Sequence, residues 1–259
     1  MRISRIHKYV LDVVDKKRRV RLERQAQGKI REQTALSAVL DSFIEKTQAS
    51  GASYADYLML YTYVRTRKPK EILECGTGVT TVVMAQALHD NEKEGVRGRL
   101  TSMEDIKNYY ENALSSFPEH LKKYVDFVYS PKVEDYYHLF RGVRYRDVPS
   151  DRQYEFVYID GPKTSTLSDK QKTFDFDFIR VIEHSEIPVF AFVDTRMSTC
   201  WALKHLLKEG KVRFDYVNQV GIIGPCTKDD LQPHTNKIIA ALGPRPIKGG
   251  SIKEVLGGR

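Results

Sequence analysis

Acidic residues follow four apolar runs of the sequence, at the positions where strands of a sheet would end. They are Glu74, Glu104, Asp160 and Asp194, and Lys163 comes shortly after Asp160. A carboxylate can accept hydrogen bonds from sugar hydroxyls or bind a cation, and a carboxylate or an amine can take a proton from an attacking hydroxyl. Because ligands gather at the carboxyl ends of the strands in an open α/β sheet, we expect these side chains to share one site.

The stretch 71–81 reads as a buried strand, a glycine turn and the start of a helix. Gly76 and Gly78 let the backbone turn tightly and approach a ligand, and Thr80 and Thr81 can cap the helix that follows. The positive end of that helix would then point at the ligand. Two glycines at this spacing also fit an ordinary tight turn, so the strand ends supply the context that indicates a nucleotide-type cradle.

Two cofactors suit such a cradle, a dinucleotide and S-adenosylmethionine. A dinucleotide fingerprint has a third glycine where this chain has Thr81, so that strand and helix can pack closely around a pyrophosphate. Thr81 therefore counts against a dinucleotide. With Glu74-Cys75-Gly76-Thr77-Gly78, an acid followed by Gly-x-Gly, the sequence resembles the class I S-adenosylmethionine-dependent methyltransferases over about residues 53–225.

That resemblance implies a site for S-adenosylmethionine. Glu74 would lie near the methionine end, and the glycine turn would contact the methionine portion. Glu104 would accept hydrogen bonds from the ribose hydroxyls, a role that its neighbour Asp105 could equally take. The implied cofactor-binding residues are Glu74, Gly76, Thr77, Gly78, Thr81, Glu104, Asp105 and Asp160.

The segment 158–163, Tyr-Ile-Asp-Gly-Pro-Lys, resembles the strand-four motif of the catechol and caffeoyl-CoA type O-methyltransferases. The resemblance implies two catalytic residues: Asp160 binds a divalent cation, Mg²⁺, and Lys163 is the general base on a hydroxyl. Asp194 is the second implied metal ligand. Thr195 stands where that family has asparagine, and a hydroxyl is a poorer ligand for Mg²⁺ than an amide oxygen.

The apolar runs predict a Rossmann-like, doubly wound α/β fold. Strands alternate with helices, which favours a mostly parallel seven-stranded sheet covered on both faces, and the closely linked last two strands indicate an antiparallel C-terminal edge hairpin. The expected strands are 71–75, 99–103, 125–129, 154–159, 188–193, 212–218 and 221–223. The expected helices are 54–67 with Ser53 as its N-cap, 82–88, 109–117, 133–140, 174–183 and 200–208, whereas 141–152 reads as an irregular connection.

Both ends of the chain extend beyond this fold. Apolar residues in 6–48 recur at three-and-four spacing, which predicts an N-terminal helical extension of one long helix or two. We expect three parts: 1–52 as a basic helical extension acting as a lid or oligomer contact, 53–236 as the methyltransferase domain, and 237–259 as a basic Gly/Pro-rich tail. The end of that tail, from Gly243 to Arg259, is expected to be poorly ordered.

The formal charge of +8 is concentrated at these two ends. Residues 1–31 carry eleven Lys or Arg against three Asp or Glu, and residues 237–259 carry five against one. The rest of the chain is therefore net acidic. The basic ends can contact phosphates, an anionic lipid or an acidic partner, and they equally fit a solvated helix face and a frayed tail.

Composition places the chain among soluble proteins. It has 259 residues, enough to bury a sizeable core, and no apolar run near the roughly 18 residues of a membrane span. Cys75, Cys200 and Cys226 lack a paired metal spacing and fit buried thiols in a reducing compartment. The first residues have neither the apolar block nor the cleavage site of a secretory signal. We therefore expect a cytoplasmic protein.

The leading interpretation is methyl transfer to a hydroxyl oxygen of a small-molecule or glycan-type acceptor, by a chain that can form a homodimer. The segment 164–173 would form one wall of the acceptor pocket, and Arg196 would either hold an acidic group of the acceptor or pair with a carboxylate. A nucleic-acid methyltransferase that uses the basic ends is an alternative, although the chain lacks the Asn/Asp-Pro-Pro-aromatic motif of base-amine methylases. A third is a non-catalytic binding protein with a vestigial cradle.

Overall fold

A seven-stranded sheet forms the centre of the protein. The computed structural model describes residues 5–47, 53–138, 140–232 and 250–257. The strand order is β3-β2-β1-β6-β7-β9-β8, with β9 antiparallel to both neighbours and the other pairs parallel. This confirms the expected Rossmann-like sheet and its antiparallel edge hairpin. The strands are β1 (Glu71–Cys75), β2 (Arg99–Glu104), β3 (Val125–Tyr129), β6 (Phe156–Ile159), β7 (Val189–Asp194), β8 (Val212–Asp215) and β9 (Val220–Cys226).

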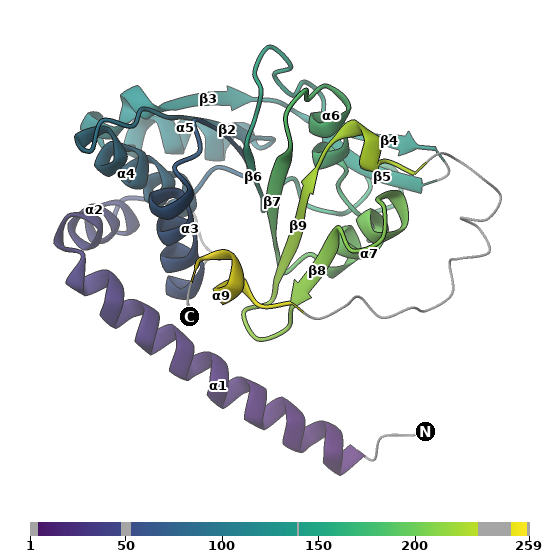
Figure 1. Cartoon of the computed structure of the whole chain (residues 1–259), viewed down its shortest axis with the longest axis horizontal. Helices are drawn as coiled ribbons and strands as arrows, with labels where there is room; N and C mark the ends of the chain where they lie inside the picture. The colour runs from purple at the N-terminus through teal and green to yellow at the C-terminus, as the bar shows by residue number, and fades with distance from the viewer. Residues whose placement is uncertain (1–4, 48–52, 139, 233–249, 258–259) are drawn as a thin grey trace.

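Helices cover both faces of this sheet, as Figure 1 shows. Because the central strands are buried on both sides, they are continuous apolar runs: all four residues of β6 are buried. One face packs against α3 (Tyr54–Arg67), α4 (Val79–Lys93) and α5 (Lys107–Ser116). The other packs against α6 (Asp177–Glu183) and α7 (Met197–Leu206).

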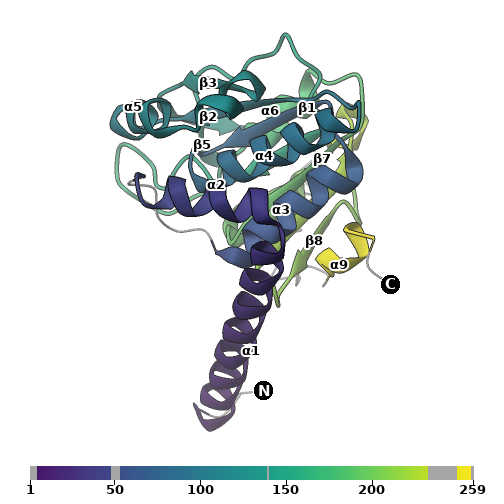
Figure 2. The ribbon, with the colours of Figure 1, turned by 90° about the vertical axis from the view of Figure 1, so that its left-hand side faces the viewer.

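The N-terminal extension is two helices, α1 (Arg5–Glu32) and α2 (Thr34–Ile44). The end of α1 and the apolar stripe of α2 belong to the same core cluster as α4, whereas the start of α1 projects away from the body (Figure 2). Glu23 of α1 fixes the contact with α3, because its two carboxylate oxygens accept hydrogen bonds from the backbone N–H groups of Tyr54 (2.7 Å) and Ala55 (3.1 Å). As predicted, Ser53 caps α3, accepting from the N–H of Asp56.

A β-hairpin replaces the helix expected at 133–140 and the first part, 141–145, of the irregular connection expected at 141–152, whereas 146–152 is irregular as expected. Its strands are β4 (Lys132–Tyr137) and β5 (Phe140–Tyr145), which pair antiparallel. Tyr137 and Tyr145 of the hairpin are buried in the core cluster that also contains Phe176. Gly142 lies so close to this cluster that a Cβ there would meet the Phe176 ring at 2.8 Å. Tertiary packing of aromatic side chains thus overrides the helix-like spacing of this segment.

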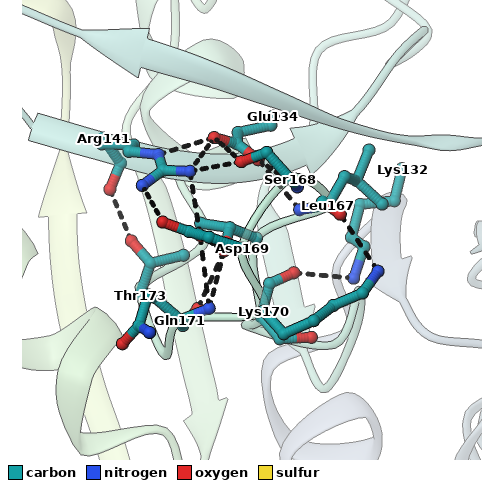
Figure 3. Close-up of polar contacts among 11 residues, drawn as sticks. Lys132, Glu134, Arg141, Leu167, Ser168, Asp169, Lys170, Gln171 and Thr173 are labelled. Atoms are coloured by element: carbon teal, nitrogen blue, oxygen red, sulfur yellow. Dashed lines mark hydrogen bonds and ion pairs between the residues drawn. The ribbon is translucent and has the colours of Figure 1, made fainter.

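The hairpin holds residues 163–173, which we call the strap, against the rest of the protein (Figure 3). Glu134 of β4 accepts hydrogen bonds from the backbone N–H groups of Leu167 (2.9 Å) and Ser168 (3.1 Å). Arg141 of β5 pairs with Glu134 and makes a two-pronged ion pair with Asp169 at 2.8 and 3.0 Å. A planar guanidinium suits this double contact, so Arg141 links hairpin and strap with a defined geometry.

Lys132 of β4 holds the first part of the strap. Its ammonium group donates hydrogen bonds to the carbonyl oxygens of Lys163 (2.9 Å) and Ser165 (3.0 Å). The chain immediately after Asp160 is therefore fixed by a side chain that lies nearly thirty residues earlier in the sequence.

The C-terminal segment is more ordered than the sequence indicates. Residues 243–249 lie outside the described residues, but residues 250–257 pack on the body and include α9 (Ile252–Val255). Ile252 donates its N–H to Asp215 at 2.8 Å, and Arg67 donates to the carbonyl oxygen of Val255 at 2.8 Å. The expectation of a poorly ordered end is wrong for 250–257, because two apolar side chains there are buried against the sheet.

Cys75, Cys200 and Cys226 are all buried free thiols, as predicted. Within the described part of the chain, no helix combines the length and the apolar character needed to cross a membrane.

Replacing Arg141 with alanine should release the strap. Glu134 would lose the charge that orients its carboxylate, so the amides of Leu167 and Ser168 should exchange with solvent about tenfold faster, as expected for one charge-assisted contact. Hydrogen exchange read by mass spectrometry or NMR measures this. The matched control is Arg144→Ala, because Arg144 pairs with Asp135 inside the hairpin (2.9 Å). Equal acceleration by both variants would contradict the prediction.

Candidate active site

A cavity of about 400 Å³ opens at the carboxyl ends of β1, β2 and β6. It brings together most of the residues that the sequence indicated: Gly76, Thr77, Gly78, Glu104, Asp105, Asp160 and Lys163. Glu74, Thr81 and Asp194 do not line it. The N-terminus of α4 also faces the cavity, so unpaired backbone N–H groups and the positive end of the helix dipole point into it.

The glycine turn depends on close contact between two backbones. Gly76 has φ +107°, and a Cβ there would lie 3.0 Å from the carbonyl carbon of Asp160. A Cβ on Gly161 would lie 2.8 Å from the Cα of Gly76. Both positions therefore require glycine. Gly78, in contrast, is the N-cap of α4 with an extended φ of −173°, so its conformation does not require glycine.

Glu74 lies beneath the turn, and its side chain is fully buried. Its carboxylate oxygens accept hydrogen bonds from the hydroxyls of Thr80 (2.5 Å), Thr81 (2.5 Å) and Ser102 (2.7 Å). Burial raises the pKa of Glu74 to about 7, although these hydroxyls act to lower it. Thr81 also accepts from the N–H of Gly78 at 2.9 Å. Glu74 and Thr81 therefore stabilise the glycine turn through buried hydrogen bonds.

Glu104, at the end of β2, faces the cavity with both oxygens positioned. One accepts from the N–H of Ile106 at 2.9 Å and the other from the N–H of Thr77 at 3.3 Å. Burial raises its pKa to about 7, and the charge of Asp105 adds to the increase. Asp105 itself has a pKa raised by burial and lowered by the nearby Lys132. The two adjacent carboxylates therefore differ in what opposes the effect of burial on their pKa, because only Asp105 has the Lys132 ammonium close by.

The roof of the cavity comes from residues that sequence reasoning missed. Phe43 and Thr47 lie at the end of α2, Tyr109 and Asn112 lie on α5, and Tyr145 ends the β5 strand. The hydroxyl of Thr47 donates to the side-chain oxygen of Asn112 at 3.5 Å and so joins the two helices. No local signal marks these residues, because they meet the glycine turn only through the packing of α2 and α5 over it.

Arg196 fixes the loop that carries Asp160. Its guanidinium donates to the carbonyl oxygens of Pro162 (2.6 Å) and Asp160, and it pairs with the carboxylates of Asp160 (3.6 Å) and Asp175 (3.4 Å). Of the two roles considered for Arg196, pairing with carboxylates is the one seen. The hydroxyl of Thr199 donates to Asp175 at 2.7 Å, so Asp175 is itself held in place.

Asp160 and Asp194 come together and share a hydrogen bond. Burial raises the pKa of both carboxyls, and the Arg196 guanidinium acts to lower that of Asp160. The charge of Asp160 adds to burial at Asp194 and raises its pKa to about 8. Contact between the two carboxyls disfavours a negative charge on both at once, and the Arg196 guanidinium favours the charge on Asp160.

The donor set around this pair does not fit the Mg²⁺ site that the strand-four motif implies. Arg196 already supplies the positive charge beside Asp160. Thr195 directs its hydroxyl at Asp194 (3.5 Å) from a backbone with φ +42°. Among the residues that the structure describes, no three His, Cys, Asp or Glu side chains are placed to hold a metal ion. Mg²⁺ prefers near-octahedral oxygen ligands, and two carboxyls that contact each other beside a guanidinium do not supply that arrangement.

Removing the buried Glu74 carboxylate should destabilise the whole domain. Glu74→Ala leaves three buried hydroxyls without their acceptor and opens a void, so we expect the free energy of unfolding to fall by about 2–4 kcal/mol. Equilibrium denaturation in urea measures it. Glu71→Ala, at the other end of the same strand, removes a long (3.8 Å), half-buried ion pair with Arg152 and no acceptor of buried hydroxyls, and should cost about 1 kcal/mol or less. Similar losses for both would contradict the role given to Glu74.

Comparison with known proteins gives a family match at this region. Residues 73–181 match the family model described as a methyltransferase domain. No curated protein matches the sequence significantly. A methyltransferase-like protein from Silicibacter pomeroyi shares 13% identity at a TM-score of 0.39, over 72% of this chain and 91% of that one. The plantazolicin methyltransferase BamL, solved with a triazolic desmethylPZN analogue and SAH, shares 11% identity at a TM-score of 0.28, over 71% of this chain and 60% of that one.

The matched region begins in β1 and ends in α6, so it contains the glycine turn, Glu104 and Asp160. The strand order supports the match independently, because β6 and β2 flank β1 and the last strand inserts antiparallel between β7 and β8. Residues 73–181 of this chain are therefore similar to a methyltransferase domain, and they lie in a Rossmann-like sheet.

Proposed function

We propose that this chain transfers a methyl group from S-adenosylmethionine to a hydroxyl oxygen of a small-molecule or glycan-type acceptor. One observation carries the proposal: a single cavity gathers the glycine turn, Glu104 and Asp160. The glycine turn and Glu104 suit a nucleoside that carries a short charged chain. Asp160 suits the role of proton acceptor.

The residues present fit the cofactor. Gly76, Thr77 and Gly78 would lie along its methionine portion, and Glu104 would accept hydrogen bonds from the ribose hydroxyls. The roof side chains Phe43 and Tyr109 would exclude water from that end of the cavity. S-adenosylmethionine bound there supplies an electrophilic methyl group on a positively charged sulfur. The carboxylates at the strand ends suit that positive charge, and a shaped cavity holds the two reactants in line.

Asp160 is the better candidate for the proton acceptor than Lys163. Asp160 is half-buried beside Asp194, and the Arg196 guanidinium holds it and favours a negative charge on it. Lys163 lines the mouth of the same cavity but has an exposed side chain, and its backbone is held by Lys132. In the proposed reaction Asp160 takes the hydroxyl proton, and Lys163 contributes positive charge at the entrance. No divalent cation is included, because the donor set does not fit one.

Calorimetry with S-adenosylmethionine, S-adenosylhomocysteine and NAD tests the proposed cofactor. We expect both adenosyl compounds to bind one per chain and NAD not to bind, because Thr81 occupies the place where a pyrophosphate site needs glycine. Glu104→Gln should weaken S-adenosylhomocysteine by about tenfold, as for one charge-assisted hydrogen-bond pair. The control Glu111→Gln lies on the outer face of α5 and should not change it. Binding of NAD alone would overturn the proposal.

The affinity for S-adenosylhomocysteine should depend on pH through Glu104. Burial raises the Glu104 pKa to about 7, so the carboxyl is mostly protonated below that pH and ionised above it. Ribose hydroxyls bind the ionised form more strongly, so affinity should fall by up to about tenfold from about pH 8 to about pH 6. Calorimetry across this range measures it. A Glu104→Gln variant should lose the dependence, and a wild-type profile that stays flat would refute the assignment.

A further inference from the structure

A second cavity lies on the other side of the Asp160–Asp194 pair. It measures about 570 Å³ and is bounded by α1, the N-terminus of α3, the end of β7 and the turn between β8 and β9. Asp194 and Thr195 line it from the sheet, and Val217 and Gln219 line it from the turn. It is thus built from segments far apart in the sequence, and α1 supplies one complete wall.

The two cavities share a wall. Asp160 lines the first cavity and Asp194 lines the second, and the two carboxyls are hydrogen-bonded to each other. A molecule in the second cavity would therefore approach the proposed cofactor through this pair. Tyr158 lies behind it, with a fully buried hydroxyl that has no hydrogen-bond partner among the described residues. The pKa of Tyr158 is raised first by burial and then by the charges of Asp160 and Asp194, which places this hydroxyl close to both.

The carboxylates on the cavity wall have hydrogen-bond partners, whereas the arginines have no carboxylate partner among the described residues. Glu23 already accepts from two backbone N–H groups of α3, and Asp56 accepts from Ser53 at 2.7 Å. Arg19 and Arg24 of α1 also line the cavity, and neither has a carboxylate partner in the part of the chain that the structure describes. Arg19 donates to the side-chain oxygen of Gln219, at 3.1 Å. The group that this wall lacks is an anion, and a guanidinium fork matches a carboxylate.

We infer that the second cavity is the acceptor site and that it takes a small hydroxy acid, with its carboxylate held by Arg19 and Arg24 and its hydroxyl directed at Asp194 and Asp160. This rests on the proposed function. The hydroxyl oxygen forms a bond to the methyl carbon as the carbon–sulfur bond breaks, the sulfur becomes a neutral thioether, and the hydroxyl proton passes to the Asp160 carboxylate. The N-terminal helix is then a specificity element, because it carries the charge that selects the acid.

Two matched pairs of probes test the inference on the full chain saturated with S-adenosylhomocysteine. They are D-glucuronate against D-glucose, and para-hydroxybenzoate against phenol, with binding read by ligand-observed NMR. For at least one pair, the acid should bind about tenfold more tightly than its neutral partner, the effect of one guanidinium–carboxylate contact. Arg24→Ala should remove that difference. Arg21→Ala changes the same charge on α1 outside the cavity and should preserve it.

A space-filling variant separates the cavity from its charges. Val217→Trp should abolish binding of the acid, whereas Tyr216→Trp, on the exposed side of the same turn, should leave it as in wild type. Both variants should bind S-adenosylhomocysteine with wild-type affinity. If they do, and the acid and its neutral partner bind alike, bind nowhere, or bind to Val217→Trp normally, the inference is overturned. Failure of the wild type to bind S-adenosylhomocysteine would instead overturn the proposed function.

Discussion

The approach of two backbones at Gly76 and Gly161 is the constraint on which the site depends. The loop after β1 and the loop after β6 touch with no side chain between them, since a Cβ on either residue would meet the other loop at about 3 Å. This contact sets the distance between the glycine turn and the Asp160 carboxylate. Arg196 then holds the second loop from the far side through the Pro162 and Asp160 carbonyl oxygens. The spacing of these two groups is therefore a property of the backbone.

Charge is arranged around that contact in layers. The fully buried Glu74 carboxylate links the start of α4 to β2, because it accepts hydrogen bonds from three hydroxyls on these elements. Asp160 and Asp194 lie further out and contact each other, and Arg196 pairs with Asp160. Burying so many carboxyls is costly unless each is paired or protonated. Here Arg196 supplies the pairing charge for Asp160.

The fold was largely accessible from the sequence, because a sheet buried on both faces needs apolar strands, and β6 and most of β7 are continuous apolar runs. The strand-end acids were accessible for the same reason, since the end of each run can be read directly. The hairpin β4–β5 was not, because its aromatic residues are spaced as in a helix and only packing on Phe176 decides between the two. Nor could the position of Glu74 be read, because a carboxylate looks the same in sequence whether it faces a cavity or three buried hydroxyls. The cavity roof at Thr47 and Asn112 depends on helix packing over long sequence distances.

The contact of Glu23 with the first turn of α3 has a consequence for how such a chain can diversify. It uses backbone N–H groups, so it places no demand on the side chains of α3, and the rest of α1 can change around it. Because α3 leads directly into β1, α1 is held in register with the glycine turn while its cavity-facing residues remain free to vary. If the second cavity binds the acceptor as proposed, exchange of one N-terminal helix would change the acceptor and leave the glycine turn untouched.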